Sequence, residues 1–209
     1  TAGGNLIATN VVSISNSDAN DIDLTTTGGS ITGGSITAIG QGDVTLTASG
    51  EILDGAGKIT ADVLTAISGG AQTLDTTVNS LIAETSGAGS IEVIETDAIA
   101  LTDVRSANGP IDVSAGGATW IGSVVSTTDA DANDISIVAA TGDITVGMVS
   151  AGQSQGDVTV QATTGSIVDD IDDATADITG DVVTLTAGSG IGVANSLDTV
   201  AISITASVT

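Results

Sequence analysis

Residues 42–54 read GDVTLTASGEILD, and this stretch decides the fold class. Val44, Leu46 and Ala48 alternate with threonines, so an extended strand here has one apolar and one polar face. A Gly-marked turn follows the strand, and a second short apolar stretch, ILD, follows the turn. β-Branched side chains such as these favour pleated strands over helices. The stretch therefore predicts two short strands joined by a tight corner.

The same pattern recurs along the chain at intervals of roughly 20–24 residues. GSIEVIE begins at Gly89, GDVTVQA at Gly156 and GDVVTLTA at Gly180, and a third apolar stretch such as KITAD, from Lys58, often completes the cycle. No segment has a helical period. We therefore predict an all-β fold, a parallel β-solenoid (β-helix) of about nine coils of roughly 20–24 residues, with three short strands in each coil. By analogy with strand crossovers, we expect the solenoid to be right-handed.

A longer repeat underlies the short one. NVVSISNSDANDIDL, from Asn10, and SVVSTTDADANDISI, from Ser123, share the phrase DAND, and their starting points lie 113 positions apart. Further matched phrases follow at nearly the same offset. We interpret residues 1–113 as a first long repeat unit and residues 114–209 as a second, incomplete unit, within a single continuous solenoid over residues 1–209.

An antiparallel β-sandwich is the alternative fold, because it is also rich in glycine and short strands. A sandwich predicts hairpin dipeptides such as Asn-Gly between its strands, and a few aromatic side chains in its core. The chain has a single such dipeptide, Asn108-Gly109, and it has no Phe or Tyr. These observations favour the solenoid.

The composition limits the partners of this protein. The chain has 26 acidic and 2 basic residues, a net charge of −24 and a mean hydropathy of +0.42. Its many aliphatic residues predict a folded core, which a disordered acidic chain lacks. The charge argues against nucleic acid and anionic membrane surfaces as partners. No apolar run approaches the roughly 20 residues of a membrane-spanning helix, so we expect no membrane insertion.

The composition also argues against catalysis. The chain has no His, Tyr or Cys, and Lys58 and Arg105 are its only basic residues. Acid–base and electrostatic catalysis need such groups at one site. Carboxylate pairs that recur in a repeat are explained more simply as charged residues at solvated turns than as catalytic pairs. We therefore expect a protein that is not an enzyme.

Acidic loops make calcium the one cofactor for which the sequence offers ligands, although the fold requires none. DADAND, at residues 129–134, places oxygen ligands at alternating positions, and VDDIDDATAD, at residues 168–177, is a further acidic stretch. The candidate ligands are Asp129, Asp131, Asn133 and Asp134, with Asp18, Asn20 and Asp21 in the first long repeat unit. The Gly and the closing Glu of a calcium hand are missing, so solvated acidic turns remain the alternative.

Two residues are candidates for binding a partner on the side of the solenoid. Arg105 lies in DVRSANGP, at residues 103–110, which departs from the repeat. Trp120 is the only aromatic residue, and an indole face can stack on a sugar ring. The position that corresponds to Trp120 in the first long repeat unit is Ile7, which favours a plain apolar packing position.

Four phrases carry a family resemblance. They are GDVTLTASGEI, ITADVLTAISGG, LDTTVNSLIAETSGAGSI and DVVTLTAGSGIGVANSLDT, which begin at Gly42, Ile59, Leu74 and Asp181. They resemble the repeat regions of β-strand-repeat or filamentous-haemagglutinin-like giant bacterial surface and secreted proteins, which include adhesins and exoproteins. The resemblance implies an extracellular or cell-surface location in a bacterium or archaeon, and a structural or adhesive role. The present chain is far more acidic than the well-known haemagglutinin, so host-cell binding is not carried over.

We therefore expect a structural extracellular repeat protein that forms a stiff rod or filament by stacking coil on coil. Its main partner is then the protein itself, through head-to-tail contacts or tandem continuation of the solenoid. The alternative is an adhesin module that recognises a surface glycan or protein on the side of the solenoid.

Overall fold

The computed structural model describes residues 1–193 and 195–209, and this part of the chain forms twenty strands and no helix. The first ten strands are β1 (Leu6–Ser13), β2 (Ile22–Thr26), β3 (Ile31–Ala38), β4 (Val44–Ala48), β5 (Ile52–Asp54), β6 (Ile59–Ser68), β7 (Gln72–Ala88), β8 (Ile91–Glu95), β9 (Ile99–Asn108) and β10 (Ile111–Ala115). The other ten are β11 (Thr119–Ile121), β12 (Val124–Ser126), β13 (Ile135–Ala139), β14 (Ile144–Val146), β15 (Val149–Ser150), β16 (Val158–Ala162), β17 (Ser166–Asp169), β18 (Ile178–Ala187), β19 (Gly190–Ile191) and β20 (Thr199–Val208).

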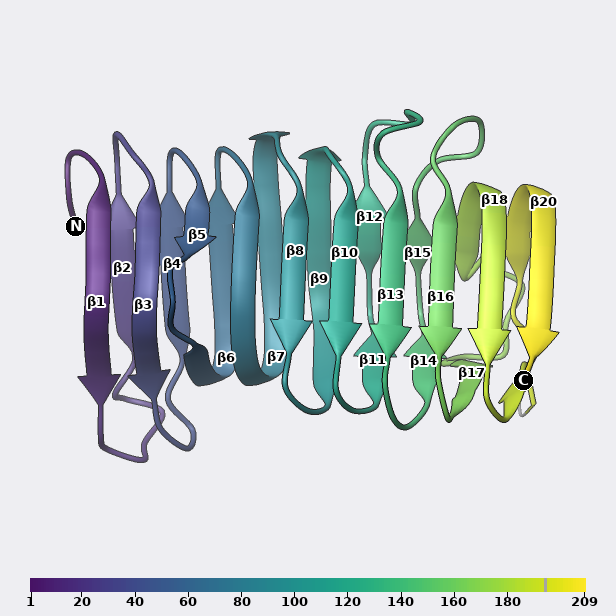
Figure 1. Ribbon diagram of the computed structural model, residues 1–209, viewed down its shortest axis with the longest axis horizontal. Helices are drawn as coiled ribbons and strands as arrows, with labels where there is room; N and C mark the ends of the chain where they lie inside the picture. Colours follow the sequence, from purple (N-terminus) through teal and green to yellow (C-terminus); the bar gives the residue numbers. More distant parts are fainter. Residues whose placement is uncertain (194) are drawn as a thin grey trace.

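The strands wind into a parallel β-solenoid, as the sequence predicts. One column of in-register residues passes through every coil: Leu6, Ile31, Ile52, Gln72, Ile91, Ile111, Ile135, Val158, Val183 and Ile204. We call it the first column, and its ten members mark ten turns where about nine were expected. The strands stand side by side along the rod, and the two termini lie at opposite ends (Figure 1). Every strand pairing is parallel, which rules out the antiparallel sandwich.

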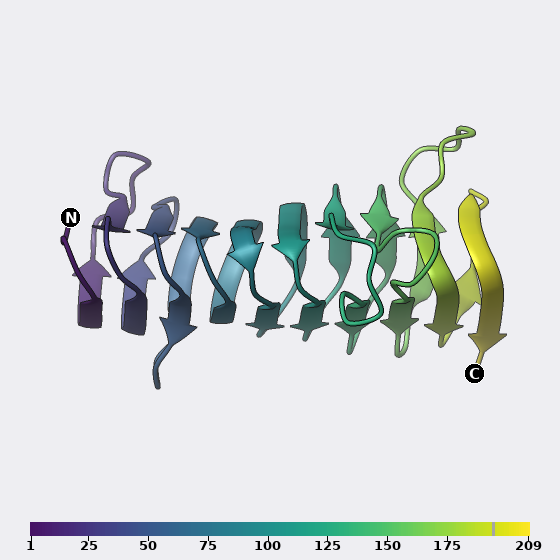
Figure 2. The ribbon, with the colours of Figure 1, turned by 90° about the horizontal axis from the view of Figure 1, so that it is seen from above.

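Three separate strands per coil describe only some of the coils, such as the one formed by β10, β11 and β12. In one coil the chain passes through β16, β17 and the start of β18, and the long corner loops project from the side of the rod (Figure 2). In the middle, β7 alone has 17 residues and runs around corners without a loop. The spacing along the first column is 19 residues from Gln72 to Ile91 and 25 from Val158 to Val183. Strands that span two sides occur in coils of different length, because β18 also pairs with two strands, β15 and β16.

The core consists of stacked aliphatic side chains. A second column contains Ile22, Val44, Leu64, Leu81, Leu101, Ile121 and Val146, all buried. Val44, Leu46 and Ala48 face inward and the threonines between them are only half-buried, so the predicted alternation is confirmed. Burying one such aliphatic side chain contributes about 1.5–3 kcal/mol, and the stack repeats this gain in every coil.

A row of buried hydroxyl groups lines one corner of the solenoid. Ser68, Thr85, Ser106 and Ser126 are buried and stand in register on successive coils. The Ser106 hydroxyl donates to the carbonyl oxygen of Gly89 at 3.1 Å, and that of Ser126 donates to Gly109 at 3.1 Å. These bonds satisfy backbone carbonyl groups at the corner, where the regular hydrogen bonding between strands is interrupted.

The two copies of the long repeat lie on different sides of the solenoid. In sequence, β4 of the first copy corresponds to β16 of the second. In space, however, β16 shares the first column with β5, the strand that follows β4. The second copy is therefore rotated by one side of the coil relative to the first. The proposed boundary between residues 113 and 114 falls inside β10.

Candidate functional site

The DADAND loop precedes β13, and its carboxylates bind backbone groups of a neighbouring coil. The Asp129 carboxylate accepts hydrogen bonds of 2.9–3.2 Å from the backbone N–H groups of Gln153, Ser154, Gln155 and Gly156. Desolvation opposes the ionised form, but these bonds outweigh it and hold the pKa of Asp129 below its ordinary value. Asp129 therefore acts as an anionic cap for the loop of the next coil.

The other residues of this loop also stabilise the corner. Asn133 is buried, and its amide Nδ2 donates to Asn108 Oδ1 at 2.8 Å and to the carbonyl oxygen of Thr128 at 2.9 Å. Asp134 Oδ1 accepts the backbone N–H of Asp157 at 2.9 Å. Asp131 is exposed.

The first long repeat unit repeats these contacts with different residues. Asp21 Oδ1 accepts the backbone N–H of Asp43 at 3.0 Å, as Asp134 does one long repeat later. Asn16 Oδ1 accepts the backbone N–H of Gln41 at 3.1 Å, in the position that Asp129 takes in the second copy. Asp18 is exposed and Asn20 is half-buried. Sequence reasoning missed Asn16, although its offset of 113 from Asp129 was visible.

Calcium at these residues stays a prediction. Within residues 1–193 and 195–209, no three Asp, Glu, His or Cys side chains are grouped to hold one metal ion. The carboxylates of Asp21, Asp129 and Asp134 each accept a backbone N–H group instead. The repeated phrase therefore has a structural explanation, which is that it links successive coils.

Trp120 lies on the outside of the solenoid, so the expectation of an apolar packing position is wrong. It is the middle residue of β11, between two inward-facing residues, and it is 39 % exposed. Its in-register neighbours are Ala100 and Thr145. The indole Nε1–H donates to Asp170 Oδ1 at 3.1 Å, and a Cβ at Gly122 would come within about 3 Å of the ring. These contacts fix the ring while leaving part of it open to solvent.

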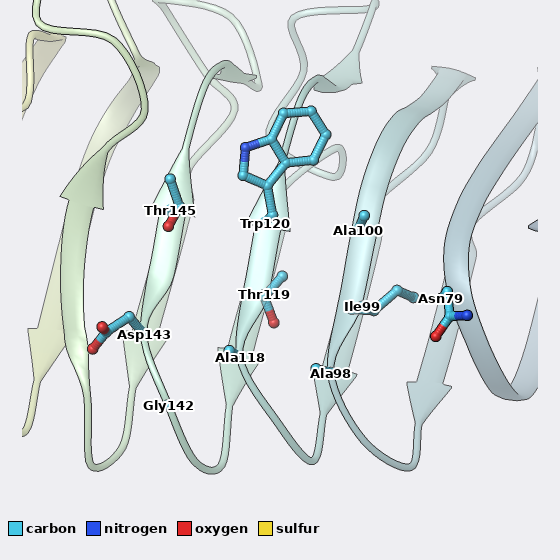
Figure 3. Close-up of a pocket in the computed structure, with 10 residues that line it drawn as sticks. All are labelled: Asn79, Ala98, Ile99, Ala100, Ala118, Thr119, Trp120, Gly142, Asp143 and Thr145. Atoms are coloured by element: carbon cyan, nitrogen blue, oxygen red, sulfur yellow. The ribbon is translucent and has the colours of Figure 1, made fainter.

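A groove of about 620 Å³ adjoins Trp120. It is lined mainly by small side chains, with a few polar groups: Asn79, Ala98, Ile99, Ala100, Ala118, Thr119, Gly142, Asp143 and Thr145. Figure 3 shows Trp120 standing at one end of this surface, with Ala98, Ala118 and Gly142 at the corner of the coils. The groove is shallow enough for the indole to remain the most prominent side chain on it.

Arg105 and Trp120 do not form one binding site. Arg105 lies in β9, and its Nη2 is 3.7 Å from Asp103 Oδ1. Arg105 does not line the Trp120 groove. Residues 103–108 belong to β9, and the register of β9 against β7 shifts on both sides of Arg105, so the stretch is a strand with some of the irregularity that sequence reasoning expected.

Carboxylates gather at the corner between β17 and β18, where they line a hollow of about 130 Å³. We call this group the acidic corner, and it consists of Asp169, Asp170, Asp173 and Asp177. Asp169 and Asp177 are each only 5 % exposed. Asp169 Oδ1 accepts the backbone N–H of Ile171 at 3.0 Å, whereas Asp169 Oδ2 has no hydrogen-bond partner among the described residues. Sequence reasoning offered Asp169, Asp170, Asp172, Asp173 and Asp177 as further candidate calcium ligands, with solvated turns as the alternative, and did not foresee the burial of Asp169 and Asp177.

Burial and neighbouring charges affect the protonation of this corner. Asp177 Oδ2 accepts the backbone N–H of Asp198 at 2.7 Å, which favours the ionised form. Burial, and then the carboxylates of Asp169, Asp198 and Asp173, outweigh that bond and raise the pKa of Asp177. The corner is therefore a place where negative charge is concentrated and poorly solvated.

Glu95 is a further buried carboxylate, at the end of β8. Its in-register neighbours are Thr76 and Ala115. Its Oε2 accepts the backbone N–H of Val78 at 3.0 Å, and its Oε1 accepts that of Thr96 at 2.7 Å. Burial is the largest effect on this group, and it raises the pKa of Glu95 despite these bonds.

No protein-family model matches the chain, and no curated protein or solved structure matches it. The described residues include no helix that is long and apolar enough to cross a membrane.

Proposed function

We propose that this protein is a structural extracellular repeat protein whose coils stack into a stiff rod or filament. The observation that carries the proposal is the open surface at the last coil. In β20, Ile204 and Val208 are 51 % and 57 % exposed, whereas their in-register neighbours on β18, Val183 and Ala187, are fully buried. A further coil placed on β20 would bury these side chains as the interior coils bury theirs.

The first coil has an open edge of the same kind. Among the described strands, β1 pairs only with β3, and β20 pairs only with β18. Each outer edge thus presents backbone N–H and C=O groups that can pair with another parallel strand. Contacts between the two unlike ends do not close into a ring, so they extend the rod along its axis.

The charge distribution favours growth along the axis over side-by-side association. The chain has a net charge of −24, and its two basic side chains already contact acidic ones, Lys58 with Asp75 at 3.1 Å and Arg105 with Asp103 at 3.7 Å. Acidic side chains such as Glu92 and Asp112 are exposed on the flanks. Flanks of like charge repel one another. Ten turns at about 4.8 Å give a rod about 43 Å long for this chain. The resemblance to giant surface and secreted proteins supports a location outside the cell.

The proposal is tested by the assembly state of the 209-residue chain. Sedimentation velocity over a hundredfold range of concentration, at about 0.15 M salt to screen the flanks, is expected to show end-to-end oligomers. Cryo-electron microscopy of the concentrated sample should show fibres with layers about 4.8 Å apart. Ile204→Lys places a charge on the open edge and should shift the protein to monomers.

Ile94→Lys is the matched control, because Ile94 is exposed on the side of the rod and not at an end. It should leave assembly unchanged. A wild-type chain that remains monomeric at every concentration would contradict stacking between chains, and equal loss of assembly in both variants would show that the open edge is not the contact.

A second candidate function is the recognition of a glycan on the side of the rod. The half-exposed Trp120 beside a groove lined by small side chains favours it, because aromatic faces stack on the apolar faces of sugar rings. The acidic surroundings of the groove favour a neutral glycan over an anionic one. The two functions differ in one measurable way, since Trp120→Ala would abolish glycan binding and leave assembly intact.

A further inference from the structure

We propose that the acidic corner binds a divalent cation of the calcium type, held chiefly by the carboxylates of Asp169 and Asp177. This site differs from the DADAND loop, whose carboxylates bind backbone groups. The inference concerns a metal site within one chain and does not depend on the proposed rod function.

Asp169 is the residue that points to a ligand. Asp169 continues the second column: it is in register with Val146, which is in turn in register with Ile121. Both of these aliphatic side chains are fully buried. A carboxylate in such a place is unfavourable unless its oxygens are bonded. Asp169 lines the hollow, and its Oδ2 is buried and has no hydrogen-bond partner among the residues that the structure describes. One oxygen of a buried carboxylate is therefore left for a group from outside the chain.

Asp177 supplies the second buried carboxylate. It lines the same hollow from the start of β18, and it is as little exposed as Asp169. Asp173 and the hydroxyl-bearing Thr175 also line the hollow. No third acidic side chain of the described residues is grouped with Asp169 and Asp177 around one ion, so water completes the coordination. All of these are hard oxygen donors, which calcium prefers.

The chain cannot neutralise this corner with its own cations. Lys58 and Arg105 contact Asp75 and Asp103, and neither of them lines the hollow. Only a proton or an external cation can therefore balance two buried carboxylates here.

The size of the hollow agrees with a partly hydrated ion. A water molecule takes about 30 Å³ of liquid volume, so about 130 Å³ holds one ion with a few waters. Calcium accepts 6–8 oxygens in a flexible arrangement and magnesium demands a near-ideal octahedron. Two carboxylates and a few waters on an irregular corner agree with the flexible coordination of calcium.

The only tryptophan of the chain is a built-in reporter for this site. The indole N–H of Trp120 donates to Asp170, which adjoins Asp169 in sequence and lines the same hollow. We expect CaCl2 titrated into the EDTA-treated chain at pH 7 to change the Trp120 emission in a saturable way. At a hundredfold excess over Kd, the unfolding temperature should rise by about 5 °C or more. NaCl of matched ionic strength serves as the reference.

Variants then assign the response to the acidic corner. Asp169→Asn and Asp177→Asn should each weaken calcium binding at least tenfold, and the double variant should abolish the rise in unfolding temperature. Asp131→Asn removes an exposed carboxylate of the DADAND loop and should leave the response unchanged. Trp120→Phe should remove the fluorescence signal and keep the thermal one, which separates the reporter from the site.

Two results would overturn the proposal. One is a calcium response no larger than that of matched NaCl. The other is a response that Asp131→Asn removes and Asp169→Asn does not.

Discussion

Individual carboxylates have different tasks in this solenoid, although the sequence shows them as similar acidic corners. Asp129 is exposed and accepts four backbone hydrogen bonds from the next coil. Asp169 is buried and has one oxygen without a partner among the described residues. The first is an anion that the chain itself satisfies, and the second needs something from outside. The backbone position of each residue, and not its identity, makes this difference.

Removing the Asp129 carboxylate should loosen the loop that it caps. In Asp129→Ala, the amide hydrogens of residues 153–156 should exchange faster with solvent, because four N–H groups lose their acceptor. The pKa of Asp129 is lowered, so its contribution is present at neutral pH and is lost as pH falls below about 4. Hydrogen-exchange mass spectrometry measures this directly. Asp131→Ala is the control, and equal exchange in both variants would refute the capping role.

Strands meet at the corners of each coil, and the bonding at a corner explains whether one strand continues around it or ends there. Where the corner is a short Gly-containing turn, as between β4 and β5, separate strands form. Along β7 the strand continues around a corner where the Glu95 carboxylate accepts the backbone N–H of Val78. The buried hydroxyl groups lie instead near strand ends, where they donate to carbonyl groups of the turns. The row of Ser68, Thr85, Ser106 and Ser126 is therefore part of the architecture and not a polar defect in the core.

Removing one hydroxyl from this row should destabilise the coil. Ser106→Ala removes one donor to the Gly89 carbonyl and one acceptor of the Thr85 hydroxyl, and leaves these two groups only their mutual 3.5 Å bond, which should lower the free energy of unfolding by about 1–2 kcal/mol. Ser114→Ala is the matched control, because Ser114 faces outward on β10 and its loss should change stability by less than about 0.5 kcal/mol. Urea denaturation measures both. Equal stability of the two variants would show that the buried hydroxyl row does not contribute to the free energy of unfolding.

At the scale of strands, most of the architecture was predictable, because alternation and spacing depend only on local chemistry. Alternation identified Val44, Leu46 and Ala48 as inward-facing, and the structure confirms it. The surroundings of Trp120 and Asp169 were not predictable, because they depend on which side of the coil each residue occupies. Comparison of the two repeats aligned Trp120 with Ile7, but it could not reveal the groove or the bond to Asp170.

The whole molecule is a highly charged rod with few basic groups to compensate. Four carboxylates have a pKa raised chiefly by burial: Asp54, Glu95, Asp112 and Asp177. Each of them binds a proton more tightly in the folded state than in the unfolded chain. Their contribution to stability is present at low pH and is lost as pH rises through the raised pKa values.

Stability in EDTA and low salt should therefore be greater at pH 5 than at pH 7.5. Self-repulsion of a chain with a net charge of −24 acts in the same direction. The urea midpoint at the two pH values is the measurement, and about 0.5 M NaCl should reduce the difference by screening. A higher midpoint at pH 7.5 would contradict this account.

The rotation of the second long repeat by one side of the coil affects how a longer array of such repeats would look from outside. Each copy advances the chain by five coils and one side, as the path from Ile22 to Ile135 shows. Equivalent surface features in successive copies then follow a spiral around the rod and return to the same side after three copies, roughly sixteen coils or about 77 Å. A neighbouring rod lying alongside would meet a given loop only once in that distance, so the pitch of this spiral would set the spacing of any lateral contact.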